Sequence, residues 1–415
     1  MPSTRPASPP TRRLRFVPAG FKGLVRRYVS FIERDQRDYR ARDPFADLPP
    51  VHEVPGSPAR LGIVREFCHY HKWYVAACRE MGVSYRLIDI SGDDWIERLR
   101  RSECQGFLVW PSVSRRAWRE MFDERLRVME SELGLVVYPG YHETWMYENK
   151  RRVRDWLLAK GVPHPRTWIF FERAAAERFI ADVPLPVVVK TNLGAAHSGV
   201  WIVRDRAELR RRVRQAFGHG LLARGRYWGE AEAGFILMQE FLPDVREWRM
   251  VRIGDSYFGH PKGRLGDFHS GSGKVEWTPP ERRHLDLLKH VTDLGGFTSM
   301  DVDVFETPAG ELLVNELQTV FGAGFSVDQS RVEGKAGRFV HRAGNDPWQF
   351  EPGDFARNAC ANARVDVLLQ TLARRQGSGG PGGGAAGSLT LPGTAPATGH
   401  CRGTTPGGVE NRAGC

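Results

Sequence analysis

The first third of the chain alternates between short apolar runs and segments with apolar residues at helical spacing. The apolar runs predict three strands, at residues 60–64, 85–90 and 107–110. The segments 67–81 and 93–101 between them predict helices. Strands that alternate with helices need crossover connections, which favour a parallel sheet. The pattern therefore predicts a small α/β domain that ends near Tyr138.

A different pattern begins after this domain. Two further helices are expected at 145–160 and 174–181, and the apolar runs that follow are joined by turns instead of helices. These runs predict strands at residues 187–190, 200–203, 235–240, 248–253, 256–260, 298–305 and 311–317. The succession predicts an α/β unit followed by largely antiparallel α+β structure.

Both ends of the chain differ in composition from the rest. The first eighteen residues are rich in Pro, Ser and Arg and are expected to be disordered, whereas the apolar spacing over 21–32 predicts one amphipathic helix. The basic face of this helix would suit a membrane surface, but docking on its own protein is the favoured interpretation. From about Gly377 the chain is rich in Gly, Pro and Ser, which predicts a disordered tail.

The net charge of +11 comes largely from one segment. Residues 1–42 contain eleven Arg or Lys against three acidic residues, so the body that follows is nearly neutral. A nucleic-acid-binding domain would carry its basic surface on the folded part, so nucleic acid is not a favoured partner. The sequence shows no apolar run of roughly 18 residues and no secretory signal, which favours a cytoplasmic protein. The six cysteines show no paired metal spacing.

The run PVVVK ends in Lys190, and the loop after it is rich in small residues, including Gly194, Ser198 and Gly199. Small residues let backbone N–H groups approach phosphate oxygens closely, and the lysine adds a positive charge. These features predict a phosphate-binding loop. An ordinary glycine-containing hairpin is the alternative.

A second apolar strand, ILMQEFLP, covers residues 236–243. A strand of this kind offers the apolar slot and the backbone edge that an adenine ring needs, although any buried strand could have the same sequence. The residues at its end are Gln239, Glu240 and Leu242. The hairpin that follows spreads basic side chains over a region of polyphosphate size, for which a solvated basic face is the alternative. These side chains are Arg249, Lys262, Arg264 and His269.

The segment GGFTSMDVDVFETPAGELLVNELQ contains two apolar strands joined by a tight turn at 308–310. Pairing the strands back from this turn brings Asp303 opposite Glu316 to within a residue or two, while Gln318 shares a face with Glu316. Buried carboxylates without partners are costly, so three converging oxygen side chains predict a cation. Hard oxygen donors suit Mg²⁺ shared with nucleotide phosphates. Ordinary edge acids on a hairpin are the alternative.

With these features in this order, residues 60–330 resemble the ATP-grasp superfamily. Lys150, in YENKRRVRDWLLAKGVPHPRTWIF, matches the first nucleotide-binding lysine of the superfamily, and Lys190 matches the second. The loop NLGAAHSGV is similar to the flexible loop that covers the phosphates. The segments REFCHYHKW, YENK and DFHSGSG are similar to ATP-grasp proteins encoded among surface-polysaccharide genes.

The resemblance also assigns roles to residues of the later strands. The adenine-binding hinge is matched by Gln239, Glu240 and Leu242, with Glu247 as a ribose contact. The magnesium ligands are matched by Asp303, Glu316 and Gln318, where Gln replaces the more common Asn and keeps an amide oxygen. The expected catalytic residues are Arg249, Lys262 and His269, and the histidine stands where the resemblance leads us to expect an arginine.

The fold that the resemblance implies is an α/β N-terminal (pre-ATP-grasp) domain plus an α+β ATP-grasp domain, whose two subdomains sandwich the nucleotide. The chain would begin with a basic, partly disordered segment that contains one amphipathic helix (1–55) and continue with the pre-ATP-grasp domain (56–140). The two ATP-grasp subdomains would follow (141–235 and 236–335). A C-terminal helical extension (336–376) and the disordered tail (377–415) would complete it.

The activity that the resemblance implies is that of a carbon–nitrogen ligase that uses ATP and Mg²⁺. Such an enzyme activates a substrate carboxylate as an acyl phosphate for attack by an amine, so a small-molecule acid and an amine would be its partners. An ATP-grasp-fold kinase and a non-catalytic nucleotide-binding protein are the alternatives, and the intact lysines and magnesium ligands argue against the latter. Glu66, His69 and His71 would either close one side of the acceptor site or form an exposed helix start.

Overall fold

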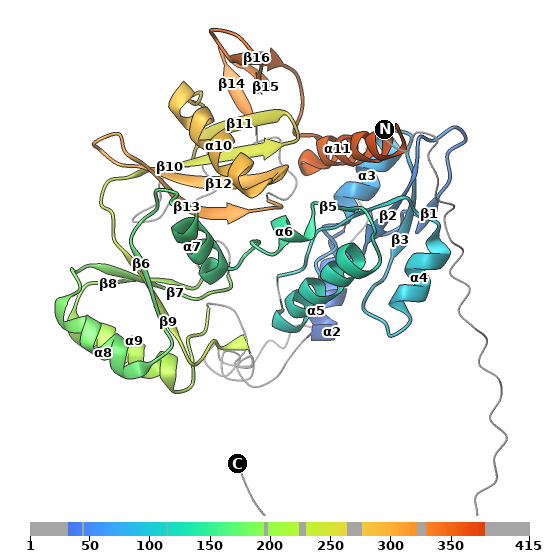
Figure 1. Ribbon diagram of the computed structural model, residues 1–415. Coiled ribbons are helices and arrows are strands. Elements are labelled where there is room, and N and C mark those ends of the chain that lie inside the picture. The colour runs from blue at the N-terminus through green and yellow to red at the C-terminus, as the bar shows by residue number, and fades with distance from the viewer. Residues whose placement is uncertain are drawn as a thin grey trace, which may run out of the picture. The chain divides into compact units, whose positions relative to one another are not determined.

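The computed structural model describes residues 32–43, 45–113, 115–194, 198–223, 230–263, 276–321 and 329–377. The described residues up to Arg374 belong to one compact unit. Three β-sheets organise this unit (Figure 1). The helix expected at 21–32 and the tail expected after Gly377 lie almost entirely outside the described residues. The first described element is the helix α2 (Ile32–Ala41).

The first sheet has five strands in the order β1-β3-β2-β4-β5. Its strands are β1 (Val51–His52), β2 (Arg60–Val64), β3 (Ser84–Ile88), β4 (Gly106–Leu108) and β5 (Val137–Tyr138). All neighbouring pairs from β3 to β5 are parallel, and β1 adds to the edge in the antiparallel direction. The crossovers contain the helices α3 (Lys72–Glu80), α4 (Trp95–Ser102) and α5 (Arg116–Arg127), the last extended by a π-helical turn (Val128–Glu132). The α/β domain predicted from the sequence is therefore confirmed.

Both faces of this sheet are buried, which explains its nearly continuous apolar strands. On one face, Leu61 and Ile63 pack with Tyr74 of α3 in one core cluster. On the other face, Phe107 packs with Phe122 of α5 in a second cluster. The two layers of helices thus account for the strand pattern by burial alone.

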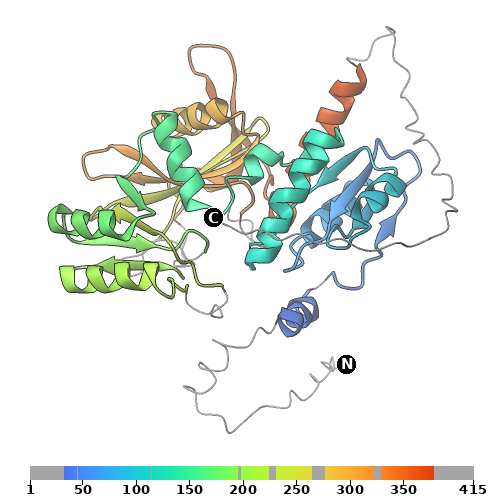
Figure 2. The ribbon, with the colours of Figure 1, turned by 60° about the horizontal axis from the view of Figure 1, so that its bottom comes forward.

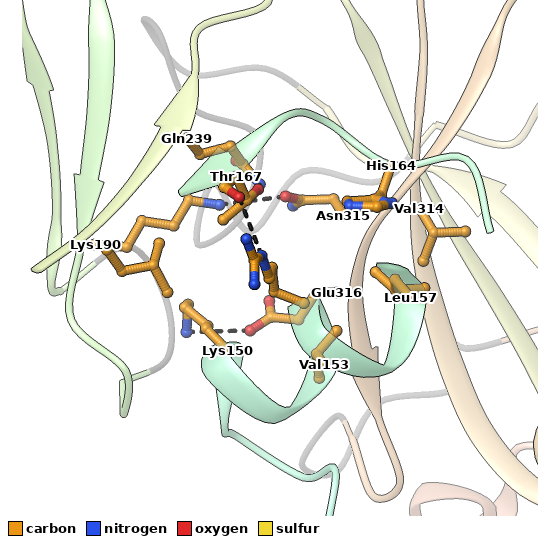
Figure 3. A pocket seen from close by; sticks show the side chains of 12 residues that line it. Lys150, Val153, Leu157, His164, Thr167, Lys190, Gln239, Val314, Asn315 and Glu316 are labelled. Atoms are coloured by element: carbon orange, nitrogen blue, oxygen red, sulfur yellow. Dashed lines mark hydrogen bonds and ion pairs between the residues drawn. The ribbon is translucent and has the colours of Figure 1, made fainter. Parts of the chain in front are cut away.

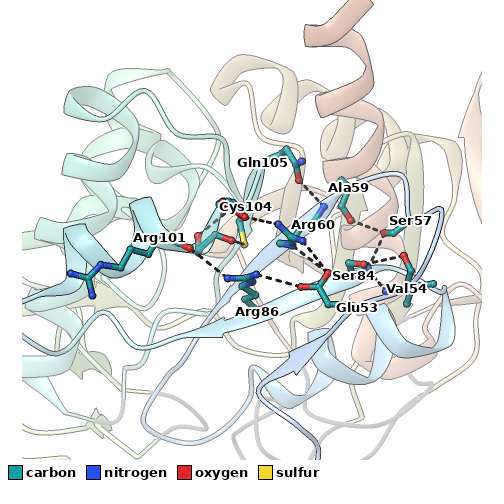
Figure 4. A network of polar contacts seen from close by, with 12 residues as sticks. Glu53, Val54, Ser57, Ala59, Arg60, Ser84, Arg86, Arg101, Cys104 and Gln105 are labelled. Carbon is teal, nitrogen blue, oxygen red and sulfur yellow. Dashed lines mark hydrogen bonds and ion pairs between the residues drawn. The ribbon is translucent and has the colours of Figure 1, made fainter. Parts of the chain in front are cut away.

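A polar network fixes the segment before β2 to the edge of the sheet (Figure 4). The carboxylate of Glu53 pairs with Arg60 at 3.2 Å and with Arg86 at 3.5 Å, while Glu103 pairs with Arg60 at 3.1 Å. The backbone N–H of Arg60 also donates to Oε1 of Gln105 at 2.6 Å. These groups are partly exposed, so we assign the network a local positioning role.

The second sheet has four strands in the order β6-β9-β7-β8, and each neighbouring pair is antiparallel. Its strands are β6 (Thr167–Phe170), β7 (Val187–Lys190), β8 (Val200–Val203) and β9 (Ile236–Glu240). The helices α8 (Arg173–Asp182) and α9 (Arg206–Phe217) lie side by side against it (Figures 1 and 2). Ile180 and Val213 from these helices pack against Val189 and Met238 of the sheet. Two short helices, α6 (Tyr141–Thr144) and α7 (Lys150–Ala159), precede this subdomain.

The third sheet has seven strands, all paired antiparallel, in the order β13-β12-β10-β11-β15-β14 with β16 beside β15. Its central strands are β10 (Arg246–Ile253), β11 (Ser256–Pro261), β12 (Ser299–Glu306) and β13 (Leu312–Gln318). Three shorter strands extend it, namely β14 (Ser330–Val332), β15 (Lys335–His341) and β16 (Trp348–Pro352). The expectation of a largely antiparallel α+β part is confirmed by these two sheets.

The two faces of the third sheet differ in polarity because side chains alternate along each strand. Trp248 and Met250 face a core cluster formed with α7 and with α10 (Arg282–Gly295). On the opposite face, Arg249 lies beside Asp303 in the register of β10 and β12. This polar face carries much of the predicted chemistry.

Two parts of the predicted fold need correction. The segment 336–376, expected to be a helical extension, begins with β15 and β16, and its helix α11 (Arg357–Gly377) starts later, with a left-handed kink at residues 358–360. Strands form there because the segment extends the third sheet beyond β11. The apolar face of α11 then packs on the first domain, where Leu368 and Leu372 approach Gly106. The helices α5, α9 and α10 and the strand β6 were not among the expected elements.

Candidate functional site

A pocket of about 360 Å³, including the open space at its mouth, lies between the second sheet and the edge strand of the third (Figure 3). The helix α7 forms one wall with Lys150, Arg154 and the apolar residues Val153 and Leu157. The second sheet supplies Thr167, Lys190, Leu237 and Gln239, and β13 supplies Val314, Asn315 and Glu316. His164 comes from the connection between α7 and β6. Four of the predicted site residues therefore line one pocket: Lys150, Lys190, Gln239 and Glu316.

Two lysines face this pocket from different elements. Nζ of Lys150, at the first position of α7, lies 3.2 Å from Oε1 of Glu316 and donates to the carbonyl oxygen of Gly194 at 2.8 Å. Nζ of Lys190, at the end of β7, donates to Oδ1 of Asn315 at 3.2 Å. The contact of Lys190 crosses from the second sheet to the third, and Lys150 joins α7 to both β13 and the loop after β7.

Burial affects the two lysines differently. It lowers the pKa of Lys190 to about 8, and the charge of Lys150 acts in the same direction while Glu316 only partly offsets them. Burial would also lower the pKa of Lys150, but the carboxylates of Glu316 and Glu148 outweigh it and raise that pKa above its ordinary value. Lys190 is therefore the cation that would gain most from an anionic ligand.

A β-bulge in β13 places two neighbouring polar residues in the pocket. Asp303 pairs with Glu316, whereas the next residue of β12, Val304, pairs with Val314, so Asn315 is the extra residue. A bulge re-aims side chains that strict alternation would send to opposite faces. This explains why both Asn315 and Glu316 line the pocket. The first was missed in the sequence, because alternation alone gives no signal for a bulge.

The loop after β7 is closely packed where it is described. A Cβ at Gly199 would lie 1.9 Å from Oγ1 of Thr191, and Gly194 has a φ of +141°, so both positions favour glycine. Oγ1 of Thr191 also donates to the carbonyl oxygen of Leu193 at 2.8 Å. Ser198 is half-buried. Residues 195–197 lie outside the described residues.

Of the three residues predicted to form the adenine-binding hinge, only Gln239 lines the pocket. Nε2 of Gln239 donates to Oγ1 of Thr167 at 3.2 Å inside the pocket. Both oxygens of Glu240 instead bind Arg166, through its backbone N–H at 2.6 Å and its Nε at 2.7 Å. Leu242 is half-buried beyond the strand and does not line the pocket.

A second polar cluster lies on the third sheet. Nζ of Lys262 donates to Oε1 of Glu247 at 2.7 Å and to Oδ2 of Asp303. Nε of Arg249 lies 3.0 Å from Oδ2 of the fully buried Asp301. Burial would lower the pKa of Lys262, but Asp303 and Glu247 raise it above its ordinary value. Glu247, predicted to contact a ribose, is thus bound to a lysine and is 3% exposed.

The three predicted magnesium ligands come from the adjacent strands β12 and β13. Asp303 lies opposite Glu316 as predicted, and Gln318 pairs with Asp301 on the same two strands. Oε1 of Gln318 is buried and has no hydrogen-bond partner within the described part of the chain. Among the described residues, no group of three or more His, Cys, Asp or Glu side chains is arranged to hold a metal ion. A cation here would therefore need the amide oxygen of Gln318 as well as the two carboxylates.

Several other predicted residues lie outside these two clusters. Arg264 and His269 belong to a segment outside the described residues. Glu66 and His71 are 3% and 5% exposed, so the exposed helix start considered for them is wrong. The carboxylate of Glu66 instead accepts the backbone N–H groups of Cys68 and Tyr70, which stabilises the turn before α3.

Comparison with known proteins gives structural neighbours only. No family profile and no curated protein matches the sequence. An ATP-grasp protein with a RimK domain from Sphaerobacter thermophilus aligns over 62% of this chain and 90% of its own, with 17% identity and a TM-score of 0.43. An ADP complex of N5-carboxyaminoimidazole ribonucleotide synthetase aligns over 79% and 100%, with 12% identity and a TM-score of 0.48.

The D-cycloserine synthetase DcsG aligns over 75% of this chain and 99% of its own, with 16% identity and a TM-score of 0.48. These scores lie below 0.5, so the interpretation of the pocket depends on the residues and topology of this chain. Among the helices that the structure describes, none is both long and apolar enough to cross a membrane.

Proposed function

We propose that the chain is an ATP- and Mg²⁺-dependent ligase that activates a substrate carboxylate as an acyl phosphate for attack by an amine. The observation that carries this proposal is the pocket in which Lys150 and Lys190 meet Glu316 between two antiparallel sheets. Two cations against one carboxylate leave a net positive charge. That charge suits the phosphates of a nucleotide.

The rest of the pocket suits the other parts of a nucleotide. Val153, Leu157 and Leu237 give it apolar walls, and the amide of Gln239 gives it one oriented polar group. This combination supports a base between apolar side chains with its phosphates directed toward the two lysines.

The residues on β12 and β13 fit Mg²⁺. Two carboxylates and an amide oxygen form a set of hard oxygen donors, and Oε1 of Gln318 has no hydrogen-bond partner among the described residues. We therefore propose that Asp303, Glu316 and Gln318 would hold the ion. When bound, Mg²⁺ would neutralise charge that develops on the phosphates during transfer.

The protein's own part in such a reaction is positioning and charge compensation. Lys150 and Lys190 would hold the phosphates, while Lys262, which contacts both Glu247 and Asp303, would orient these two carboxylates on the polar face of the third sheet. Arg249, held by Asp301, would orient the acid toward the terminal phosphate. The acid and the amine would then form an amide as ATP is converted to ADP and phosphate, with one proton released by the amine. We also propose that His269 takes part in the reaction, on the basis of the sequence alone.

The experiment that tests this function combines the purified protein with Mg²⁺, ATP and a panel of carboxylic acids, with hydroxylamine as a general amine. A ligase should form the hydroxamate of an accepted acid together with equal amounts of ADP and free phosphate. A kinase of the same fold would leave the phosphate on the substrate, which ³¹P NMR distinguishes. A non-catalytic nucleotide-binding protein would bind ATP and give no product with any acid.

A further inference from the structure

The loop after β7 is held at its start by one buried carboxylate. The backbone N–H groups of Asn192 and Leu193 donate to Oε2 and Oε1 of Glu232, at 2.5 and 2.8 Å. Glu232 is 5% exposed, and this burial raises its pKa even though the two N–H groups act in the opposite direction. A carboxylate suits this place because each of its oxygens accepts from one of two successive donors.

Glu232 is itself fixed by its backbone. It forms an isolated antiparallel bridge with Leu221, in which both N–H···O bonds are 2.8 Å long. A Cβ at Gly220 would lie 2.9 Å from the carbonyl carbon and oxygen of Glu232, so the two segments approach closely. The carboxylate is therefore presented to the loop from a closely packed support.

The residues next to Glu232 contact the first domain. Oε2 of Glu230 accepts the backbone N–H of Arg116 at 2.9 Å, and the carbonyl oxygen of Ala231 accepts Nη2 of the same arginine at 3.2 Å. Arg116 is the first residue of α5, which covers the parallel sheet. Residues 230–232 thus connect the loop to the α/β domain.

The loop is also joined to the start of α7. Oδ1 of Asn192 accepts the backbone N–H of Arg151 at 2.9 Å, and its carbonyl oxygen accepts the backbone N–H of Lys150 at 3.2 Å. Nζ of Lys150 then reaches forward to the carbonyl oxygen of Gly194. The position of Asn192, which Glu232 holds, therefore fixes the distance between the two lysines that face the pocket.

We propose that Glu232 is a positioning residue for the nucleotide site. Its carboxylate fixes the start of the loop that follows Lys190 and contacts Lys150. Residues 230–232 also contact α5 and so connect this loop to the α/β domain. The inference rests on the proposed function, since it presumes that the pocket binds a nucleotide. Glu232→Gln removes one of the two acceptors and places an NH₂ group against a backbone N–H, so the loop start should lose its fixed position.

The test is the affinity of Glu232→Gln for Mg²⁺ and a non-hydrolysable ATP analogue, measured by calorimetry well below the melting temperature. We expect binding at least tenfold weaker than in the wild type. The matched control is Glu177→Gln on α8, which loses an exposed ion pair with Arg173 and should bind as the wild type does. A Glu232→Asp variant keeps both oxygens and should recover part of the affinity.

Hydrogen exchange supplies a second measurement that a purely structural role would not change. Nucleotide should slow exchange of the Arg116 amide in the wild type, and this effect should be lost in Glu232→Gln. Affinity within twofold of the wild type, or equal protection of Arg116, would overturn the inference. If Glu232→Gln does not fold, Glu232→Asp decides: its shorter side chain should leave affinity below that of the wild type, and affinity equal to the wild type would overturn the inference. A wild type that binds no nucleotide would refute the proposed function itself, and this inference with it.

Discussion

Binding of ATP near pH 8 should be accompanied by proton uptake at Lys190. Burial and the nearby charge of Lys150 lower the pKa of this lysine to about 8, so close to half of the free protein carries an uncharged amine at that pH. Phosphate oxygens beside Nζ favour the charged form. Each nucleotide bound at pH 8 should therefore take up about half a proton.

The direction of the pH dependence follows from the same shift. Affinity should be fully present well below pH 8 and should fall as the pH rises through it, approaching about tenfold per pH unit. The pKa values of Lys150 and Lys262 are raised, so both stay protonated over this range. The phosphates, whose last pKa is about 6, stay ionised.

The assay is calorimetry with a non-hydrolysable ATP analogue in two buffers of different ionisation enthalpy, repeated from neutral pH to beyond pH 9. The control is Lys190→Arg, because a guanidinium keeps its charge in this range. We expect the arginine variant to bind without proton uptake. The reasoning would be refuted if the wild type took up no protons at pH 8, or as many as the arginine variant.

Three further predictions concern separate parts of the structure. Glu316→Gln keeps the shape of the side chain but removes the charge that faces Lys150, so folding should survive while acid-dependent ADP formation falls by several orders of magnitude. Adding Asp303→Asn should lower the rate of ADP formation little further if both residues act in one unit. Gly199→Ala should lower both the melting temperature and nucleotide affinity, because a Cβ there meets Thr191, and wild-type values for both would contradict the packing of the loop. Glu53→Gln removes ion pairs with Arg60 and Arg86, neither of which lines the pocket, and should leave nucleotide affinity unchanged in the same titration.

The strands of the fold were largely predictable because burial determines their pattern. Residues 60–64, 187–190 and 200–203 form strands with the predicted bounds, since each is a short apolar run that a sheet can bury. The segment 335–352 was not predictable in this way. Its strands mix exposed, half-buried and buried residues without regular alternation, and such a pattern resembles an irregular extension until its partner strand is known.

The candidate site was predictable where local rules apply. A tight turn fixes the register of a hairpin, so counting back from the turn brought Asp303 opposite Glu316 to within a residue or two. The bulge at Asn315 shifts the register by one residue, which counting from the turn does not predict. Its side chain reaches Lys190, which is 125 residues earlier in the sequence, and no periodicity could indicate this contact. The pairing of Glu240 with Arg166 depends in the same way on the neighbouring strand.

The central claim is that the pocket between the second and third sheets binds the phosphates of ATP through its lysines. The most direct measurement is a calorimetric titration of the wild type and of Lys190→Ala with a non-hydrolysable ATP analogue, with and without Mg²⁺. We predict one nucleotide per chain, a requirement for Mg²⁺, and at least about tenfold weaker binding after loss of a charged hydrogen bond. Equal affinity in the two proteins, or no binding by the wild type, would contradict the claim.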